Sequence, residues 1–514
     1  LKLYSGGLGL LAGDQLKASS DLDPPLCAVG RAYHDGYFHQ IIDREGHQEA
    51  GGDRNDFESP PFEPVMVGRY APLRVTVQLP TGPVQVRAWK LQVGRIPLYL
   101  LDTNVPENRP EDRAITNRLY GGDIAHRLRQ EMILGLGGYQ LLTELDIEPD
   151  VYHMNEGHAL PLVYELYAKY RDMETVKDKV VFTTHTPEDA GNEEHNIDLL
   201  HKLGFFNALD LETVRSITMT HDDTFNLTVG ALRASKITCA VSKLHGEVAN
   251  RMWKDCEGSS EIIYITNAQN RRFWMDKGMP TALGEQGDSA LLARKKHLKR
   301  LLFNVVADQT GKMFDADVLT IVWARRFAEY KRPGLLKQDL DRFIRLLEDD
   351  ERPIQVIWAG KPYPFDTNAV NAFNELIHIS YKHKNMAVLI GYELELSFIL
   401  KKGSDVWLNT PRVSREASGT SGMTASMNGS IHLSTNDGWH PEFAKHGINA
   451  FTIPPSDSNK PIEEQDYEDN KNLMDIIENE IIPMYYNKPE QWTQMMKSAM
   501  SDVSPAFDSG RMAN

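Results

Sequence analysis

The chain alternates short apolar runs with segments of helical periodicity, and it does so in both halves of its 514 residues. This alternation is typical of parallel strands that helices bury on both faces. In the second half, strands are expected at 318–323, 354–358, 386–390, 405–408, 430–433 and 450–453. Helices are expected between them, as at 334–347 and 370–378. The second half is therefore predicted to be a doubly wound parallel sheet.

The later part of the first half repeats the pattern. Strands are expected there at 150–154, 179–183, 237–241 and 262–265. A chain of this length is too long for a single core. We therefore expect an α/β protein with two doubly wound, Rossmann-like domains, residues 1–267 and 268–514, whose strand ends face a cleft.

Other segments complete the predicted architecture. A Gly-rich loop from Tyr4 to Asp14 leads into a helix at 15–21, and alternating residues at about 70–103 predict an antiparallel β insertion with a structural role. Apolar residues at helical spacing from 126 to 145 predict one long amphipathic helix. The acidic, helical stretch 465–500 is expected to pack back on the first domain.

The composition argues against several classes of function. A net charge of −16 without a broad basic stripe argues against a nucleic-acid or anionic-membrane partner. No apolar run has the length of a membrane span, and no signal-peptide pattern is present. Cys27, Cys239 and Cys256 lack metal-ligand spacing and are too few for a disulfide framework, so we expect no metal site and a cytoplasmic protein with reduced thiols. The chain starts at Leu1 inside a Gly-rich motif, which leaves open that it is a fragment.

Polar residues follow several expected strands of the first half. Asn155 and His158 come after the strand at 150–154, His185 follows the next strand, and Asn267 follows the last. A single histidine at such a place is more often a helix cap or another satisfied polar residue. Several polar side chains at successive strand ends favour a binding site, because ligands of open α/β sheets bind there.

A run of cations follows the first strand of the second half. Arg325, Arg326, Lys331 and Arg332 lie within eight residues. Charge runs are usually solvated faces. At the ligand edge of a sheet, however, this run favours a site for phosphate or another oxyanion.

The stretch from Trp407 to Gly429 joins a strand to a short helix through six small residues, 417–422. Small side chains leave backbone N–H groups uncovered, and a helix N-terminus adds its dipole, so the stretch is suited to an anion. Glu416 adds a carboxylate for a hydroxyl-rich ligand. The alternative is a plain Gly/Ser-rich connector. Together with the cations, the loop predicts an enzyme that acts on a sugar phosphate or a nucleotide sugar.

Longer motifs run through nearly the whole chain in a characteristic order. They are Ser5–Gly9, Arg129–Gly138, His153–His158, Thr183–Pro187, Val241–Gly246, Thr266–Asn267, Arg325–Lys331 and Glu416–Thr420. In these motifs the sequence resembles the α-glucan phosphorylases, that is, the glycogen, starch and maltodextrin phosphorylases.

The resemblance implies a glycosyltransferase B-type fold and reversible phosphorolysis of α-1,4-glucans to glucose 1-phosphate, with retention at the anomeric carbon. It also implies α-glucan and inorganic phosphate as substrates and pyridoxal 5′-phosphate as cofactor, and it is compatible with a homodimer. By motif match it implies catalytic roles for His185, Arg326, Lys331 and Glu416. The implied substrate contacts are Leu8, Asn155, His158, Asn267, Tyr330, Ala417, Ser418 and Gly419. The implied cofactor contacts are Gly6, Gly7, Trp274, Arg325, Thr420 and Thr424.

The sequence departs from the family at the cofactor lysine. In phosphorylases a lysine that forms an imine with pyridoxal phosphate follows the last motif's methionine, whereas here Thr424 follows Met423. A hydroxyl group cannot form an imine. Residues 268–270 also differ from the family's Gly-Val-His-like stretch, and 364–374 lacks a following Gly-Lys pair.

Three hypotheses follow. The protein is a divergent phosphorylase that holds pyridoxal phosphate non-covalently or through another lysine. Alternatively, it transfers glucose from a different donor, such as a nucleotide sugar, or it is a catalytically weak glucan-binding relative. The retained pair of Arg326 and Lys331 favours an enzyme, and the residues kept around Thr424 favour the phosphorylase hypothesis.

Overall fold

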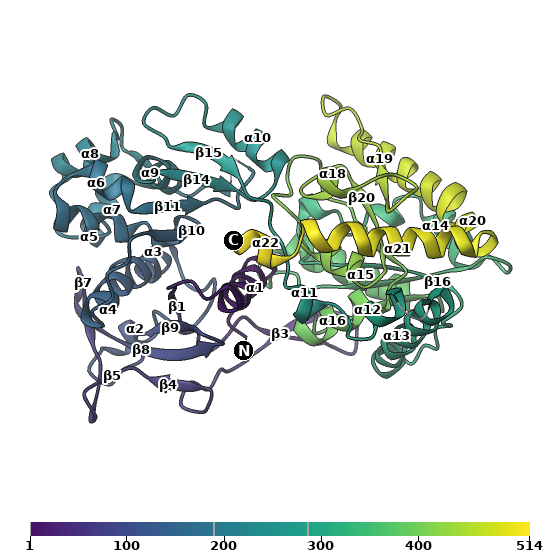
Figure 1. The fold of residues 1–514 in the computed structure, drawn as a ribbon, viewed down its shortest axis with the longest axis horizontal. Coiled ribbons are helices and arrows are strands. Elements are labelled where there is room, and N and C mark those ends of the chain that lie inside the picture. Colours follow the sequence, from purple (N-terminus) through teal and green to yellow (C-terminus); the bar gives the residue numbers. More distant parts are fainter. Residues whose placement is uncertain (1, 189–190, 285–286) are drawn as a thin grey trace. The chain divides into compact units, whose positions relative to one another are not determined.

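The computed structural model describes residues 2–188, 191–284 and 287–514. The chain forms two compact units, each containing a parallel sheet covered by helices (Figure 1). The first unit comprises the chain up to Phe38, Gly52–Thr266 and the last two residues, and the second comprises His39–Gly51 and Asn267–Met512. The predicted α/β class with two Rossmann-like sheets is confirmed. Within the described ranges, no helix combines the length and apolarity needed to cross a bilayer.

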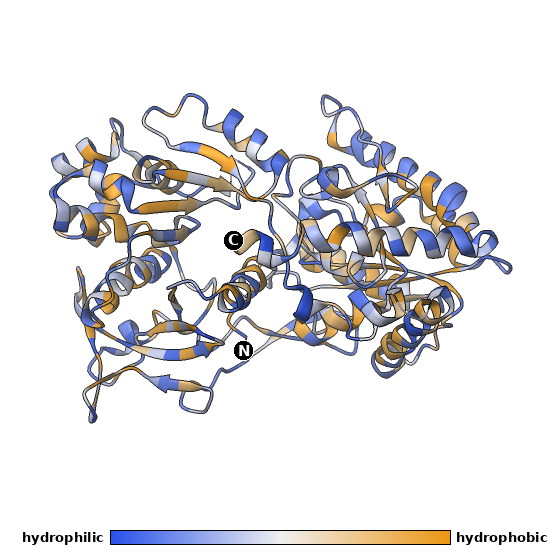
Figure 2. Cartoon of the chain, in the orientation of Figure 1, coloured by the Kyte–Doolittle hydropathy of each residue, from blue (hydrophilic) through white to orange (hydrophobic). Residues whose placement is uncertain are grey.

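The parallel sheet of the first unit has four strands, hydrogen-bonded in chain order. They are β10 (Tyr152–Asn155), β11 (Val180–Thr183), β14 (Ile237–Ala240) and β15 (Glu261–Tyr264). Figure 2 shows β11 almost entirely in the hydrophobic colour, as expected for a central strand buried by helices. The helices of this region are α5 (Pro161–Tyr170), α6 (Met173–Asp178), α7 (Ile197–Leu203), α8 (Leu211–Thr218), α9 (Leu227–Ala234) and α10 (Lys243–Met252).

A mixed sheet lies beside it in the same unit. The strands β7 (Val75–Leu79), β8 (Gly82–Val93) and β9 (Ile96–Asp102) pair antiparallel in that order, as predicted. The strands β1 (Ala28–Arg31) and β4 (Phe62–Pro64) extend this sheet by pairing with β9 and β8. Side chains of β7 to β9 share one hydrophobic core with those of β10 and β11, so this segment is part of the unit's core.

The predicted helix at 126–145 is continuous but contains a π-helical stretch. It consists of α3 (Ile124–Met132), η1 (Ile133–Gly137) and α4 (Gly138–Glu144). A Cβ atom on Gly135 would lie 2.8 Å from the Leu162 nitrogen, and one on Gly138 would lie 3.2 Å from Val29 Cγ1. These glycines therefore let the helix pack closely between α5 and the mixed sheet.

The Gly-rich N-terminal segment differs from the prediction. The helix α1 spans Gly7–Leu22, so glycines predicted to form a loop make up its first turn. Gly6 has a φ of 71°, and a Cβ atom on Gly9 would lie 2.4 Å from Tyr4 Cβ. The glycines allow Tyr4 to fold back against this first turn.

The parallel sheet of the second unit has six strands in the order β18-β17-β16-β19-β20-β21. Their bounds are β16 (Leu319–Ala324), β17 (Ile354–Ala359), β18 (Met386–Leu389), β19 (Val406–Asn409), β20 (Ile431–Thr435) and β21 (Ala450–Ile453). Renumbered within the unit, this is the 3-2-1-4-5-6 order of dinucleotide-binding folds. The order reverses between β16 and β19, where the loops after the two strands diverge and leave room for a ligand.

Helices cover this sheet, and the bounds of some differ from the predicted ones. The main ones are α13 (Gly287–Thr310), α14 (Leu340–Leu347), α15 (Thr367–Ser380), α16 (Leu394–Gly403), α17 (Ser421–Ser426), α19 (Ile462–Ile476), α20 (Ile482–Asn487) and α21 (Pro489–Ala506). The segment 334–347, expected as one helix, begins with a separate 3-10 turn, η5 (Leu335–Lys337). The helices α19 to α21 belong to the second unit, in which α21 packs against α17 and β20.

A hairpin near the N-terminus belongs to the second unit, although residues 1–267 were expected to form the first domain. It consists of β2 (His39–Ile42) and β3 (Gln48–Gly51). The buried Gln40 amide group donates to the Gly360 carbonyl (3.0 Å) and accepts from the Gly391 nitrogen (2.9 Å). Gln40 thus satisfies backbone groups in the loops after β17 and β18, a contact that no local pattern indicates.

Candidate active site

The switch point of the second sheet brings two predicted site segments together. Arg325 directly follows β16, and Glu416 lies in the loop after β19. Arg325 Nη2 donates to Glu416 Oε2 at 2.8 Å, and Lys331 Nζ lies 3.7 Å from the same oxygen. All three side chains are largely buried, so this is a compact charge cluster with two cations and one carboxylate.

The charges of this cluster shift one another's pKa. Burial alone would raise the pKa of Glu416, but Arg325 and Lys331 hold it below its usual value. Burial and the neighbouring Arg325 lower the pKa of Lys331 to about 7, although Glu416 opposes this. A lysine with this pKa gains or loses its proton near neutrality, so its charge depends on what binds beside it.

Two buried polar atoms of the cluster lack a hydrogen-bond partner in the described part of the chain. They are Arg325 Nη1 and Ser418 Oγ. Buried polar atoms are normally paired, so such atoms need an explanation. Gly419 has a φ of 82° and no side chain, which leaves room beside Glu416 and Arg325. A Cβ atom on Gly419 would lie 3.2 Å from Glu416 Cγ.

The loop after β20 holds the Glu416 loop in place. Asp437 Oδ2 accepts from the backbone nitrogens of Glu416 (2.9 Å) and Arg415 (3.1 Å). The Trp439 nitrogen donates to the Ser418 carbonyl at 2.9 Å. Burial and the charge of Glu416 raise the pKa of Asp437 to about 7 despite its backbone donors. Through its hydrogen bonds to these two backbone nitrogens, Asp437 fixes the position from which Glu416 reaches Arg325.

The run of four cations divides between two roles. Arg326 is exposed, and its charge also lowers the pKa of Glu416. Arg332 is turned elsewhere: it donates to Asp469 (2.6 Å) and to the carbonyl of Thr410 (2.8 Å). Arg332 therefore ties the loops after β16 and β19 to α19 and does not join the anion-binding cluster expected of the whole run.

Other predicted residues of this unit lie around the cluster. The Tyr330 ring lies under Lys331 Nζ, 5.3 Å from ring centre to nitrogen, and burial raises the pKa of its hydroxyl. Thr420 precedes α17, while Ala417 lies in the loop between Glu416 and Ser418. Asn267 is buried in the same unit.

Two of the positions predicted to contact the cofactor, Thr424 and Trp274, are closely packed and buried. Thr424 is fully buried, and its hydroxyl donates to the Ser421 carbonyl at 2.9 Å. The His432 ring lies against Gly422, where a Cβ atom would meet Nε2 at 2.5 Å. Trp274 carries the Lys401 amine over its ring at 3.8 Å.

The predicted residues of the first unit form a second cluster. Asn155 ends β10, and its Oδ1 accepts from His185 Nε2 at 2.7 Å. Between them in the chain, Glu156 has a φ of 65° and accepts from the His185 nitrogen and from Thr186 Oγ1. A positive φ at a glutamate costs about 1–3 kcal/mol, and such strained residues concentrate at functional sites. Burial lowers the pKa of His185 to about 3, so its ring is neutral at physiological pH.

A cavity of about 240 Å³ adjoins this cluster. Leu8, His158 and His185 lie on its wall together with Glu131, Glu156 and Glu193. Gly6 and Gly7 are exposed at the start of α1, next to Leu8 in the chain. The structure thus places three of the six predicted site residues of the first unit on the wall of one cavity.

Sequence reasoning missed several residues of these clusters. Asp437 could have been found, because it follows the strand expected at 430–433 just as Glu416 follows its own strand. Glu131 and Glu193 carry no such signal, because one lies within a helix and the other in a loop far from it in sequence.

Comparisons with known proteins identify the family of the chain. The model of the carbohydrate phosphorylase family matches residues 280–503, and that of the starch synthase catalytic domain matches residues 57–252. An uncharacterized protein of Methanocaldococcus jannaschii is 41% identical over the whole chain and 95% of its own length. Maltodextrin phosphorylase of Thermococcus litoralis is 34% identical over the whole chain and 68% of the relative. Glycogen phosphorylase of Aquifex aeolicus is 33% identical over the whole chain and 82% of the relative. These matches show that the chain belongs to the α-glucan phosphorylase family.

Proposed function

We propose that the protein is a retaining glucosyltransferase that moves a glucosyl unit between an α-1,4-glucan and phosphate, with glucose 1-phosphate as the phosphorylated sugar. The observation that carries this proposal is the buried cluster in which Arg325 and Lys331 hold Glu416. It unites cations for a phosphate group with a carboxylate for sugar hydroxyls, at the position where Rossmann-like sheets bind ligands.

Each group of the cluster has a role that follows from its chemistry. Arg326 and Lys331 bind the phosphate and stabilise the charge that develops on it during transfer. Glu416 and the backbone groups of 417–419 orient the glucose hydroxyls. His185 belongs to the separate cluster of the first unit; neutral and held by Asn155, it is suited to contact a sugar there through its ring or peptide group. This arrangement needs no pair of glycosidase-type carboxylates.

Phosphate binding also changes the charge of the cluster. Lys331 has a pKa of about 7 beside Arg325 and Arg326. An approaching phosphate adds negative charge and favours the protonated amine. We propose that Lys331 takes up a proton as phosphate binds and keeps it while the phosphate is bound.

The family generally uses pyridoxal phosphate, and the residues at the expected attachment point do not fit a covalently held cofactor. Thr424 has no amine, and its hydroxyl is bonded to the Ser421 carbonyl. The His432 ring is packed against Gly422, which lies two residues before Thr424 in α17. Lys401 does not take the place of the missing amine, because its own amine lies over the Trp274 ring, 3.8 Å from the ring centre. The proposed reaction therefore forms no imine at Thr424.

A second candidate function is glucosyl transfer from a nucleotide sugar. Two observations favour it: Thr424 replaces the cofactor lysine, and a starch synthase model matches residues 57–252. A sugar nucleotide brings its own second phosphate group, so it needs no cofactor phosphate beside the cations.

A cytoplasmic location and a homodimer remain predictions from the sequence.

The experiment uses purified protein with maltodextrin under three conditions: phosphate alone, phosphate with pyridoxal phosphate, and ADP- or UDP-glucose without phosphate. Release of glucose 1-phosphate supports the first proposal, and elongation of the glucan from a nucleotide sugar supports the second. Glu416→Gln should abolish either activity, whereas Glu375→Gln at an exposed ion pair of the same unit should not. No turnover under any condition would refute both proposals. Borohydride reduction followed by peptide mass mapping would reveal any lysine that carries pyridoxal.

A further inference from the structure

A cluster of potential metal ligands lies on the wall of the cavity in the first unit. A carboxylate oxygen of Glu131, a ring nitrogen of His158 and a carboxylate oxygen of Glu193 lie within 4.8 Å of one another. The three residues come from α3, from the 3-10 turn η2 (Gly157–Ala159) and from the loop before β12 (Glu194–Asn196). Their separation in the chain explains why spacing in the sequence gave no sign of a metal site.

The first argument for a ligand here is an unpaired buried carboxylate oxygen. Glu131 is 1% exposed, and its Oε2 has no hydrogen-bond partner among the described residues. Its other oxygen, Oε1, is 3.3 Å from His158 Nδ1. A buried carboxylate oxygen without a donor or counter-charge is costly. Because Glu131 lines the cavity, a bound cation is able to reach it.

The second argument is a shortage of positive charge. Glu131, Glu156 and Glu193 line the same cavity, with the guanidinium of Arg127 as a counter-charge. Arg127 is paired with Glu193 but reaches Glu131 Oε1 only to 3.9 Å, beyond hydrogen-bonding range.

The geometry suits a metal ion. Two ligand atoms that are each about 2.1 Å from one ion lie about 3.0–3.4 Å apart at tetrahedral or octahedral angles. The observed 3.3 Å between Glu131 Oε1 and His158 Nδ1 is within this range. Two carboxylates with one imidazole suit Mn²⁺ or Zn²⁺, whereas Mg²⁺ and Ca²⁺ prefer oxygen ligands alone.

We propose that Glu131, His158 and Glu193 bind one divalent transition-metal ion, Mn²⁺ or Zn²⁺, on the wall of this cavity. The ion supplies the positive charge that Glu131 lacks and leaves coordination positions open to the cavity for water. Arg127, whose side chain is 45% exposed, competes with the ion for the carboxylates and swings outward when it binds.

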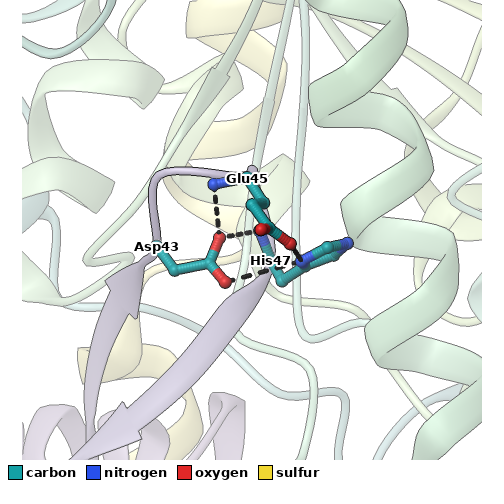
Figure 3. A group of neighbouring side chains, drawn as sticks. All are labelled: Asp43, Glu45 and His47. Carbon is teal, nitrogen blue, oxygen red and sulfur yellow. Dashed lines mark hydrogen bonds and ion pairs between the residues drawn. The ribbon is translucent and has the colours of Figure 1, made fainter.

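A second group of similar composition provides a control. Asp43, Glu45 and His47 surround the turn between β2 and β3 (Figure 3). Here Asp43 accepts from the backbone nitrogens of Glu45 (2.9 Å) and His47 (2.8 Å), so its carboxylate is already used to close the turn. The Glu45 side chain is 81% exposed. This group therefore reports non-specific binding of metal to surface side chains.

The test uses the full chain, stripped with a chelator and kept in a phosphate-free buffer. Titration with MnCl₂, followed by calorimetry and by electron paramagnetic resonance, should show one bound ion per chain with ¹⁴N coupling from His158. Glu131→Gln should weaken binding more than about tenfold, since even outer-shell changes cost 10- to 100-fold. Glu193→Gln should act similarly, and Glu45→Gln should have no effect. Arg127→Gln should strengthen binding, because it removes the competing cation.

Several results would overturn the inference. These are the absence of binding, binding that Glu45→Gln abolishes, binding that Glu131→Gln leaves intact, or bound Mn²⁺ without nitrogen coupling. Stabilisation of the wild type by maltotriose but not by Mn²⁺ or Zn²⁺ would instead assign the unpaired oxygen to a sugar hydroxyl. None of these measurements requires turnover, so the inference can fail while the proposed glucosyl transfer holds.

Discussion

Replacing Glu416 with glutamine tests the charge cluster directly. Glu416 Oε2 is 2.8 Å from Arg325 and 3.7 Å from Lys331. At an effective dielectric constant of about 20 these pairs attract by about 6 and about 4 kcal/mol before desolvation is counted. Removing one partner of a buried ion pair typically costs about 3–5 kcal/mol, because the remaining charge stays buried without compensation. We expect Glu416→Gln to lower the free energy of unfolding by that amount.

The same change should make stability depend on phosphate. In the variant, Arg325 and the protonated fraction of Lys331 lack their carboxylate, so a phosphate ion is able to take its place. Binding at about 100 times the dissociation constant adds about 2.7 kcal/mol. Urea unfolding at fixed ionic strength, in chloride and in phosphate, should show the variant recovering most of its loss, while the wild type gains less. Glu375→Gln should lose no more than about 1 kcal/mol and show no such recovery, because its pair with Lys337 is half exposed.

The reasoning would be refuted if Glu416→Gln unfolded at the wild-type urea concentration. It would also be refuted if phosphate stabilised the variant and the wild type equally. Either result would mean that Arg325 and Lys331 do not depend on Glu416 for their counter-charge.

Three further predictions concern the same cluster. Phosphate affinity, measured by calorimetry without glucan, should fall as the pH rises through about 7, because Lys331 then loses its proton; an affinity that is constant up to pH 9 would contradict this. The raised pKa of Asp437 means that the folded state binds an extra proton between about pH 4 and 7, so this residue's contribution to stability is lost as the pH rises through that window. The variant Asp437→Asn lacks this loss. Between pH 4 and 7 its free energy of unfolding, measured in urea titrations, should therefore rise by up to about 4 kcal/mol relative to that of the wild type. Gly438→Ala places a Cβ atom 2.3 Å from the Ser418 carbonyl oxygen at a φ of 59°. It should therefore lower the melting temperature more than Gly447→Ala, where φ is also positive but the space is open. Equal melting temperatures of the two variants would show that the Glu416 loop tolerates the displacement.

Much of the fold could be predicted because its signals are local. Each strand of the second sheet is a short apolar run flanked by polar residues, and its position depends only on neighbouring residues. The same holds for the cations after β16 and for the small-residue loop after β19. The boundary of α1 was missed because the fit of Tyr4 against Gly9 depends on side-chain packing that a glycine-rich pattern does not reveal.

The assembly of the candidate site could be predicted less well from the sequence. Arg332 carries the same charge as Arg325 and lies seven residues from it, but it pairs with Asp469 on α19. Gln40 lies among residues expected to form the first domain, but it satisfies backbone groups of the second unit. In both cases the partner lies more than 130 residues away, and only the folded chain brings it within hydrogen-bonding distance.

The sequence by itself determined two parallel α/β sheets, the family, and the loss of the cofactor lysine at Thr424, because these follow from local periodicity and from the identity of residues within motifs. Only the tertiary structure decided that β16 and β19 are neighbours and that Asp437 fixes Glu416. It also decided that Glu131 has a buried oxygen without a partner among the described residues. These properties depend on strand order and on burial. Strand order and burial are set by packing across the whole unit, so no single stretch of sequence contains them.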